Sequence, residues 1–278
     1  MSLLWHYTHS ATLHEIIKTR TVWATDIRFL NDSQEYQYCL DLVEQEILGI
    51  NPQYRDIWDS QRAAFAQSDL TKVHARVGVF CLTEVADDLS QWRGYAPNGG
   101  VAIGIEPASL DKLYAGRGDE AKPPAAVMGR LEKCLYDRRE QISKLAEDMA
   151  DALERATKGS KPNEVSKYAP IVYERAAKIF FYKLVEYAPT LKHPKFSQEK
   201  ETRVIVTRSA ETVDFRAGAA VLIPYVPLAF DPEFIACIQL GPTAEPELAH
   251  SSISLMAKRY GIDPEILPMT IPLRTSRL

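Results

Sequence analysis

Two glutamates and an arginine lie close together in residues 196–207, which read F-S-Q-E-K-E-T-R-V-I-V-T. The β-branched second half predicts a strand, whose side chains alternate between its two faces. We therefore expect Glu199, Glu201 and Arg203 on one face. Carboxylates this close repel each other, so ionising both is costly unless a cation or a ligand lies between them. The pattern indicates a ligand site, although a solvated sheet edge, where charges block pairing between edges, would also explain it.

A histidine stands in the middle of the first predicted strand. Residues 3–8 read L-L-W-H-Y-T, an aromatic and β-branched run that is typical of a strand. Alternation puts His6 and Thr8 on one face and Trp5 and Tyr7 on the other. Such a histidine is either a core residue bonded to the backbone or a group that contacts a ligand. The residues alone leave both interpretations open.

Helices and strands that position these residues follow one another irregularly, which predicts an α+β fold. Helical spacing and capping signals indicate helices over residues 10–19, 33–47, 54–69, 87–96 and 243–260, and two more between 138 and 188. Alternating or buried apolar runs indicate strands over residues 3–8, 21–25, 76–83, 101–106, 127–136, 196–207, 220–226 and 234–240.

No internal repeat, low-complexity segment or linker divides the sequence. We therefore expect a single domain over residues 1–278, with a helical insertion at about residues 138–188. Asp32 and Glu35 form a capping box at the start of one helix. That explanation does not extend to Asn31, which precedes the cap and remains a candidate for a function.

The composition is that of an ordinary globular protein. The chain has 278 residues, of which 46% are hydrophobic and 25% charged, and its formal net charge is -4. This charge disfavours the nucleic-acid backbone as the main partner, although it does not exclude a local basic groove. No apolar run reaches the length of a membrane span, so no membrane partner is expected.

The four cysteines are far apart and form no C-x-x-C pair, which argues against a zinc knuckle and a disulfide framework. They indicate a reducing compartment. No signal-peptide pattern opens the sequence. Cytoplasmic localisation is the default expectation, and a protein delivered into another cell without a signal would look the same.

Several short motifs occur in an order that resembles a bacterial family catalogued as a domain of unknown function, and that family is similar to the ADP-ribosyltransferases, some of which are toxins or effectors. The resemblance covers nearly the whole chain except residues of about 138–178. Its specificity lies in the order of the motifs. They are W-H-Y-T, F-L-N-D-S-Q-E, F-C-L-T, W-R-G-Y followed by G-G-V-A-I-G-I, K-H-P-K-F-S-Q-E-K-E-T-R, I-P-Y and I-Q-L-G-P.

The resemblance implies a split core of two mostly antiparallel sheets with NAD in the cleft between them. His6 would bond a ribose hydroxyl of NAD, with Thr8 near the nicotinamide end. Thr83 stands where many of these transferases carry a Ser-Thr-Ser run. Trp92 and Tyr95 share one face of a short helix and would stack on the nicotinamide, although such pairs are also typical of a core. The implied NAD-binding set is His6, Tyr7, Thr8, Asn31, Thr83, Trp92, Tyr95 and Arg203.

By the same resemblance, Glu201 is the catalytic acid and Glu199 its partner, with the reverse assignment left open. Cleavage of the nicotinamide–ribose bond passes through an oxocarbenium-like state, which a carboxylate bonded to the ribose stabilises. Nicotinamide leaves as a neutral molecule, so no metal is expected. The pyrophosphate of NAD needs a cation, for which Arg28, Arg203 and Arg274 are candidates.

The sequence therefore predicts an enzyme that transfers ADP-ribose from NAD to an unidentified acceptor protein, with arginine as the favoured side chain. A second hypothesis is an enzyme that uses the same site with a different acceptor. The acceptor would be water, which makes the protein an NAD glycohydrolase, or a nucleic-acid base. A third hypothesis is a non-catalytic module that binds NAD.

Overall fold

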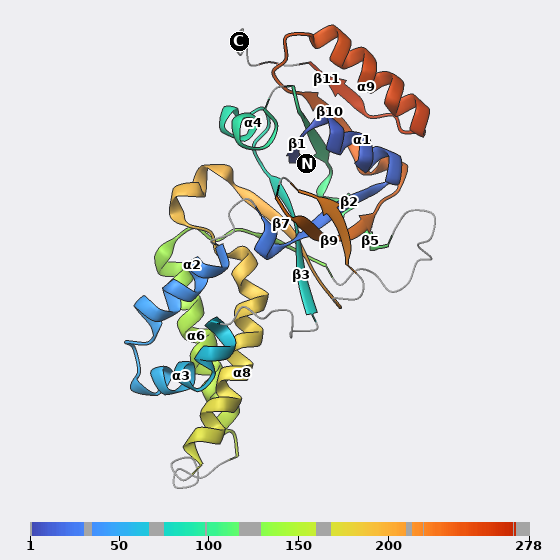
Figure 1. Ribbon diagram of the computed structural model, residues 1–278. Helices are drawn as coiled ribbons and strands as arrows, with labels where there is room; N and C mark the ends of the chain where they lie inside the picture. Colours follow the sequence, from blue (N-terminus) through green and yellow to red (C-terminus); the bar gives the residue numbers. More distant parts are fainter. Residues whose placement is uncertain are drawn as a thin grey trace. The chain divides into compact units, whose positions relative to one another are not determined.

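The strands of the chain gather in one of two structural units. The computed structural model describes residues 2–30, 35–66, 75–97, 99–116, 129–159, 168–209, 213–218, 220–268 and 270. A sheet unit comprises Met1–Asp26, Gly78–Lys133 and Gln198–Leu278, and a helical unit comprises Ile27–Val77 and Cys134–Ser197. The fold is α+β, as predicted, with an open mixed sheet (Figure 1).

The strands pair in the order β11-β10-β4-β1-β3-β2-β9-β5, with β7 also on β3, β6 on β7 and β8 on β9. Strands β10 and β11 are parallel, whereas β1–β4, β2–β9 and β6–β7 are antiparallel. The bounds are β1 (Leu4–Thr8), β2 (Thr21–Asp26), β3 (Ala75–Thr83), β4 (Val101–Ile105), β5 (Tyr114–Ala115), β6 (Arg130–Lys133), β7 (Glu201–Ser209), β8 (Asp214–Ala217), β9 (Leu222–Ala229), β10 (Ile235–Leu240) and β11 (Glu265–Leu267).

The sheet is nearly divided where β1 meets β3. Strand β1 pairs with β4 along its whole length, but among the described residues it pairs with β3 only at Trp5 and Thr83. Strand β2 pairs with the middle of β3, at Val79 and Gly78. The strands from β11 to β1 and those from β3 to β5 therefore form two parts of one sheet that are joined at a single register pair.

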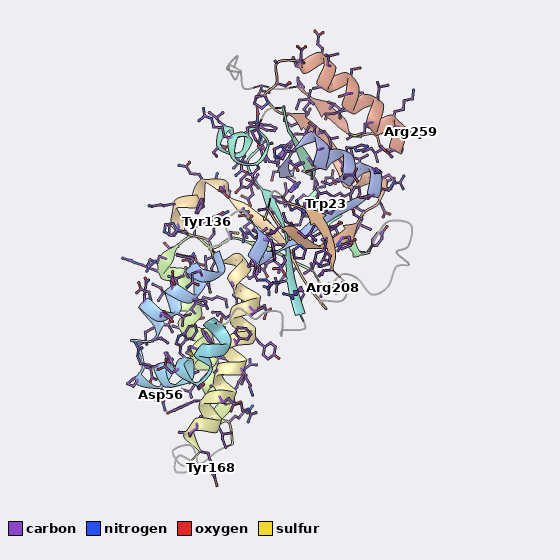
Figure 2. All side chains as sticks on the ribbon, in the orientation of Figure 1. Trp23, Asp56, Tyr136, Tyr168, Arg208 and Arg259 are labelled. Carbon is purple, nitrogen blue, oxygen red and sulfur yellow. The ribbon has the colours of Figure 1, made fainter. Side chains whose placement is uncertain are left out.

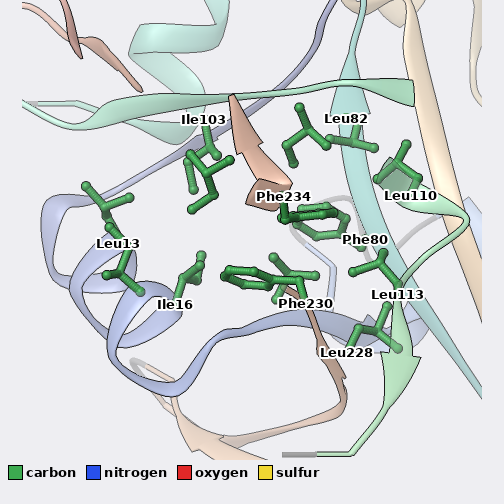
Figure 3. Close-up of a cluster of buried hydrophobic side chains, with 14 of the residues drawn as sticks. Leu13, Ile16, Phe80, Leu82, Ile103, Leu110, Leu113, Leu228, Phe230 and Phe234 are labelled. Atoms are coloured by element: carbon green, nitrogen blue, oxygen red, sulfur yellow. The ribbon is translucent and has the colours of Figure 1, made fainter. Parts of the chain in front are cut away.

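The main core covers one face of this sheet. Helix α1 (Ser10–Thr19) contributes Leu13, Ile16 and Ile17, which are buried as predicted. Helix α9 (Pro246–Tyr260) adds apolar side chains to the same cluster. Figure 3 shows Phe230 and Phe234 at the centre of this cluster, where their rings stack with centroids 4.7 Å apart.

A second, smaller cluster lies against β1 under helix α4 (Leu89–Tyr95). Asp88 caps this helix by accepting hydrogen bonds from the backbone N–H groups of Ser90 and Gln91, as an N-cap aspartate does. Trp92 is 1% exposed and packs edge-on against Tyr7, with ring centroids 4.7 Å apart. The cap and the tryptophan together fix the short helix on the sheet.

The helical unit has its own core, built from α2 (Glu35–Leu42) with its π-helical continuation η2 (Val43–Ile47), α3 (Pro52–Ala66), α6 (Arg138–Thr157) and α8 (Ala169–Tyr187). Lys183 of α8 pairs with Asp148 and Asp151 of α6, at 2.9 and 2.8 Å. The predicted insertion at residues 138–188 falls in this unit, which also includes residues 27–77. No helix of the described residues is long and apolar enough to cross a membrane.

The remaining helices are short. They are α5 (Pro107–Leu110) and the 3-10 helices η1 (Ile27–Phe29), η4 (Ala188–Thr190), η5 (Pro194–Glu199) and η7 (Pro232–Phe234).

One predicted helix boundary needs correction, and two short strands were missed. The helix expected from residue 243 begins at Pro246, because the Thr243 hydroxyl accepts from the Glu245 N–H in the preceding turn. It ends at Gly261, with φ 65°, as predicted. Strands β8 and β11, of four and three residues, were not expected. The capping box at Asp32 lies outside the described residues.

Gly241 sits where a larger residue cannot fit. A Cβ atom there would lie 2.5 Å from the Gly100 carbonyl oxygen and 2.8 Å from the Trp92 ring. We expect Gly241→Ala to lower the free energy of unfolding by about 1–3 kcal/mol, measured by urea denaturation. Gly94→Ala is the control, because no atom lies within 4 Å of its added Cβ and alanine favours the helix. Equal effects of the two substitutions would contradict this packing.

Candidate functional site

His6 lies at the junction of the two sheet parts and is held by the backbone of β3. Its Nδ1 is 2.9 Å from the carbonyl oxygen of Cys81, and its ring packs on Phe80 with centroids 4.6 Å apart. Burial of the ring lowers the pKa of His6 to about 4. The imidazole is therefore neutral near pH 7, and because Nδ1 faces a carbonyl it carries the proton there. Nε2 is left as a hydrogen-bond acceptor.

The same end of β3 holds Glu199 from the other side. The Thr83 hydroxyl donates to the carbonyl oxygen of Glu199 at 2.5 Å and accepts from the Val85 N–H at 3.1 Å. The Tyr95 hydroxyl lies 3.5 Å from Oε2 of Glu199. Residues 81–83 thus contact both His6 and Glu199, which are far apart in the sequence.

Glu201 and Arg203 form a buried ion pair on β7. Nε and Nη2 of Arg203 donate to the two oxygens of Glu201 at 2.9 and 2.8 Å, and the side chains are 1% and 8% exposed. Two-pronged pairing of this kind is the strongest form of a carboxylate–guanidinium contact. The predicted common face of Glu201 and Arg203 is therefore confirmed, and the cation beside Glu201 is Arg203 itself.

Glu199 does not share that face, contrary to the prediction. It ends the 3-10 helix η5, and β7 begins only at Glu201. Lys200 between them has φ 42°, a left-handed conformation that breaks the alternation of a strand. Its carbonyl oxygen accepts from the Glu84 N–H at 3.2 Å. The two acids consequently occupy different environments, one partly exposed and the other buried.

Two residues proposed to contact NAD are used inside the protein. The Tyr7 hydroxyl donates to the Val85 carbonyl and accepts from the Asp88 N–H, and desolvation raises its pKa to about 12. Trp92 is buried and donates from Nε1 to Asp87 at 2.7 Å. Both side chains fix the loop between β3 and α4. Of the aromatic residues predicted here, Tyr95 is the one that approaches Glu199.

The other residues predicted to bind NAD lie on β1, in the helical unit or outside the described residues. Thr8 is buried and pairs with Val101 of β4. Arg28 lies in the helical unit, with its guanidinium 5.7 Å from the Phe29 ring. Asn31 and Arg274 lie outside the described residues. No group of three or more metal-ligating side chains occurs among the residues described.

Arg216 was not among the predicted site residues. Its guanidinium lies 5.2 Å from the ring of Trp23, and Nη2 donates to the Thr25 hydroxyl at 3.3 Å. Its charge also contributes to the lowered pKa of His6. The sequence signal for this cluster is the alternation of Trp23 and Thr25 on β2, whereas the run D-F-R-A of β8 is too short to indicate a strand beside it.

Part of the chain is similar to a known protein family. Residues 91–204 match a family of proteins of unknown function, DUF2971, and the match covers less than half of the chain. It contains Tyr95, Glu199 and Glu201, includes the helices of about residues 138–178 that the resemblance was expected to leave out, and excludes His6. No curated protein and no solved structure gives a significant match. Nothing in these comparisons links the family to the ADP-ribosyltransferases.

The buried ion pair with Arg203 should make Glu201 important for the stability of the protein. We expect Glu201→Ala to lower the free energy of unfolding by about 3–5 kcal/mol, because Arg203 loses two acceptors in a buried site. Replacing Glu201 and Arg203 together with methionine should cost much less. Glu132→Ala, at an exposed position opposite Arg203, is the control. A Glu201→Ala cost no larger than that of the control in urea denaturation would contradict the pairing.

His6 should make stability depend on pH. Its folded pKa of about 4 lies below the usual value of 6.5, so the unfolded chain binds the proton first as the pH falls. Stability present near pH 7 is then lost between about pH 6.5 and pH 4. We expect a loss of about 2 kcal/mol from pH 7 to pH 5. In chemical denaturation, His6→Gln should flatten this part of the profile, and the exposed His250→Gln should leave it as it is.

Proposed function

We propose that this protein is an NAD-dependent ADP-ribosyltransferase whose favoured acceptor is the guanidinium of an arginine in another protein. The reaction breaks the bond between nicotinamide and C1′ of the ribose, and nicotinamide leaves as a neutral molecule. A bond forms between C1′ and a guanidinium nitrogen, whose proton passes to a carboxylate of the site or to water. NAD is the substrate of this reaction.

The observation that carries the proposal is the double contact of residues 81–83. The Cys81 carbonyl holds His6, and the Thr83 hydroxyl holds the backbone of Glu199. A histidine and an acid are the two groups that the E-x-E resemblance assigns to ribose binding and to catalysis. They were inferred from opposite parts of the chain, and they converge on one short segment of β3.

The divided sheet also supports the proposal. Two groups of strands joined at the single pair Trp5 and Thr83 correspond to the split core that the resemblance implies. His6 and Thr83 both lie at this junction. NAD bound here would place its nicotinamide–ribose bond beside the junction.

The protonation state of His6 suits a ribose contact. Because Nδ1 is bonded to the Cys81 carbonyl and the ring is neutral, Nε2 can accept a hydrogen bond from a ribose hydroxyl. An imidazolium would instead repel the positive charge that develops on the sugar. The low pKa therefore keeps the histidine in the form that the reaction needs.

The environments of the two acids favour Glu199 as the group that contacts the ligand. Both oxygens of Glu201 are bonded to Arg203, and its side chain is 8% exposed. Glu199 is more exposed and lies beside Tyr95. We assign Glu199 to the substrate and Glu201 to the positioning of β7. This choice takes the alternative that the sequence left open.

Transfer can be measured with NAD labelled on its adenylate part, an arginine-containing peptide, and the same peptide with lysine in place of arginine. We expect label on the arginine peptide alone, with equimolar nicotinamide released. Glu199→Gln should reduce transfer by about 100-fold or more without changing stability, as loss of one preorganised group does. Tyr95→Phe is a milder test of the contact to Glu199 and should reduce transfer by a smaller factor.

Other outcomes would contradict specific parts of the proposal. Free ADP-ribose without labelled peptide would mean that water is the acceptor. Binding of NAD without release of nicotinamide would mean a non-catalytic module. Full activity in Glu199→Gln, together with loss of activity in a folded Glu201→Gln, would return the catalytic role to Glu201.

A further inference from the structure

Partly buried Arg216 differs from the buried Arg203 of β7 in how its charge is compensated. Arg203 has a two-pronged carboxylate partner in Glu201. In the part of the chain that the structure describes, no carboxylate lies within ion-pair distance of Arg216, and its Nε is buried without a hydrogen-bond partner. Its guanidinium contacts the Thr25 hydroxyl, at 3.3 Å, and the face of the Trp23 ring.

A half-buried guanidinium without an anion is a costly arrangement. Arginine keeps its charge at all physiological pH values, and desolvation makes a lone charge unfavourable. Burial accordingly lowers the pKa of Arg216 from its usual range. An anion that binds at the guanidinium would remove this cost.

The groups around Arg216 select the type of anion. A planar guanidinium presents a rigid fork that matches the oxygens of a phosphate, and the Thr25 hydroxyl is a further donor. The rings of Trp23 and Tyr225 are in contact, with centroids 5.4 Å apart, and add an aromatic surface beside the guanidinium (Trp23 is labelled in Figure 2). Guanidinium, hydroxyl and aromatic rings together are suited to a phosphate that carries an organic group, as in a nucleotide.

The cluster lies on the same face of β3 as Thr83, whose hydroxyl holds the backbone of Glu199, whereas His6 alternates with Trp5 and lies on the other face. Thr25 is paired with Val79, and Trp5 with Thr83, and residues opposite each other on paired strands share a face. Val79 and Thr83 are four residues apart on β3, hence on the same face and about 13 Å apart at about 3.3 Å per residue. Arg216 is also close enough to His6 for its charge to be felt there.

We propose that Arg216, with Thr25 and Trp23, forms a phosphate-binding subsite that receives the pyrophosphate of the dinucleotide whose ribose lies at the end of β3, beside Thr83 and Glu199. The identity of the dinucleotide rests on the proposed function, whereas the subsite itself rests on Arg216 and its neighbours. An extended dinucleotide can span the distance between the two positions along β3. This subsite replaces Arg28, Arg203 and Arg274 as the cation for the pyrophosphate.

The subsite can be tested by binding alone. Isothermal titration of the full chain with ADP-ribose, inorganic pyrophosphate and inorganic phosphate measures the anion contact without any reaction. We expect Arg216→Gln to weaken binding of ADP-ribose and pyrophosphate by at least about tenfold, as loss of a hydrogen bond to a charged group does. Arg216→Lys, which keeps the charge and loses the fork, should lie between Arg216→Gln and the unchanged protein.

Arg259→Gln is the matched control, because it removes the same charge from an exposed position on α9 (Figure 2). It should leave binding unchanged. Urea denaturation of Arg216→Gln should show no loss of stability, since the substitution removes an uncompensated charge. A purely structural arginine would show a loss of stability instead, which would overturn the proposal.

Comparing the affinities of the three ligands shows which kind of phosphate compound the subsite binds. Binding of ADP-ribose and pyrophosphate that depends on Arg216 and exceeds that of phosphate supports a dinucleotide, and equal binding of phosphate points to a free anion and overturns the dinucleotide assignment. Equal affinities in the unchanged protein and in Arg216→Gln overturn the subsite. If no label is transferred but ADP-ribose binding depends on Arg216, the proposed transfer fails and the subsite stands. If label is transferred but ADP-ribose binding does not depend on Arg216, the proposed transfer stands and the subsite fails.

Discussion

Two hydrogen bonds at the carboxyl-terminal end of β3 hold the candidate site together. One joins the Cys81 carbonyl to the ring of His6, and the other joins the Thr83 hydroxyl to the backbone of Glu199. Both use groups that a strand fixes in place, so the separation of the histidine from the acid is set by the geometry of β3. The rest of the sheet unit serves to keep this strand end in position.

The loop after β3 shows how that position is maintained. Tyr7 bonds to both ends of the loop, at Val85 and Asp88, and Trp92 bonds to Asp87 in its middle. These aromatic side chains are core residues with a polar end, which is a common use of buried tyrosine and tryptophan. Their burial orients α4, and α4 carries Tyr95 toward Glu199.

The charges of the buried Arg203 and the partly buried Arg216 are compensated in different ways. Arg203 is neutralised within the chain by Glu201, two residues away on the same strand. Arg216 meets a hydroxyl and an indole instead. Electrostatics thus distinguish a stabilising pair from a position that an external anion would complete. The distinction follows from burial and partners, because both residues are arginines on strands.

Local patterns in the sequence predict most of the elements, because apolar spacing determines which face is buried. Leu13, Ile16 and Ile17 of α1 are an example. The common face of Glu201 and Arg203 also follows from alternation. The place of Glu199 does not, because the left-handed turn at Lys200 depends on a backbone contact to Glu84.

Other features of the site arise from contacts between distant parts of the sequence. Trp92 has room in the core because Gly241 leaves it space, and no local pattern encodes this. Arg216 reaches Trp23 and Thr25 only because β9 lies between β8 and β2. Short strands such as β8 give too little alternation to be recognised, so the residues that they carry are easily missed.

The left-handed residue between the two glutamates limits how this segment can vary. Lysine in that conformation is strained by about 1–2 kcal/mol, whereas glycine and, to a lesser degree, asparagine or aspartate relieve the strain. A valine or isoleucine at position 200 would favour extended backbone and would draw Glu199 into the strand, away from Tyr95. The spacer in E-x-E is therefore a conformational determinant here, and its identity distinguishes chains with two separated acids from chains whose acids lie side by side.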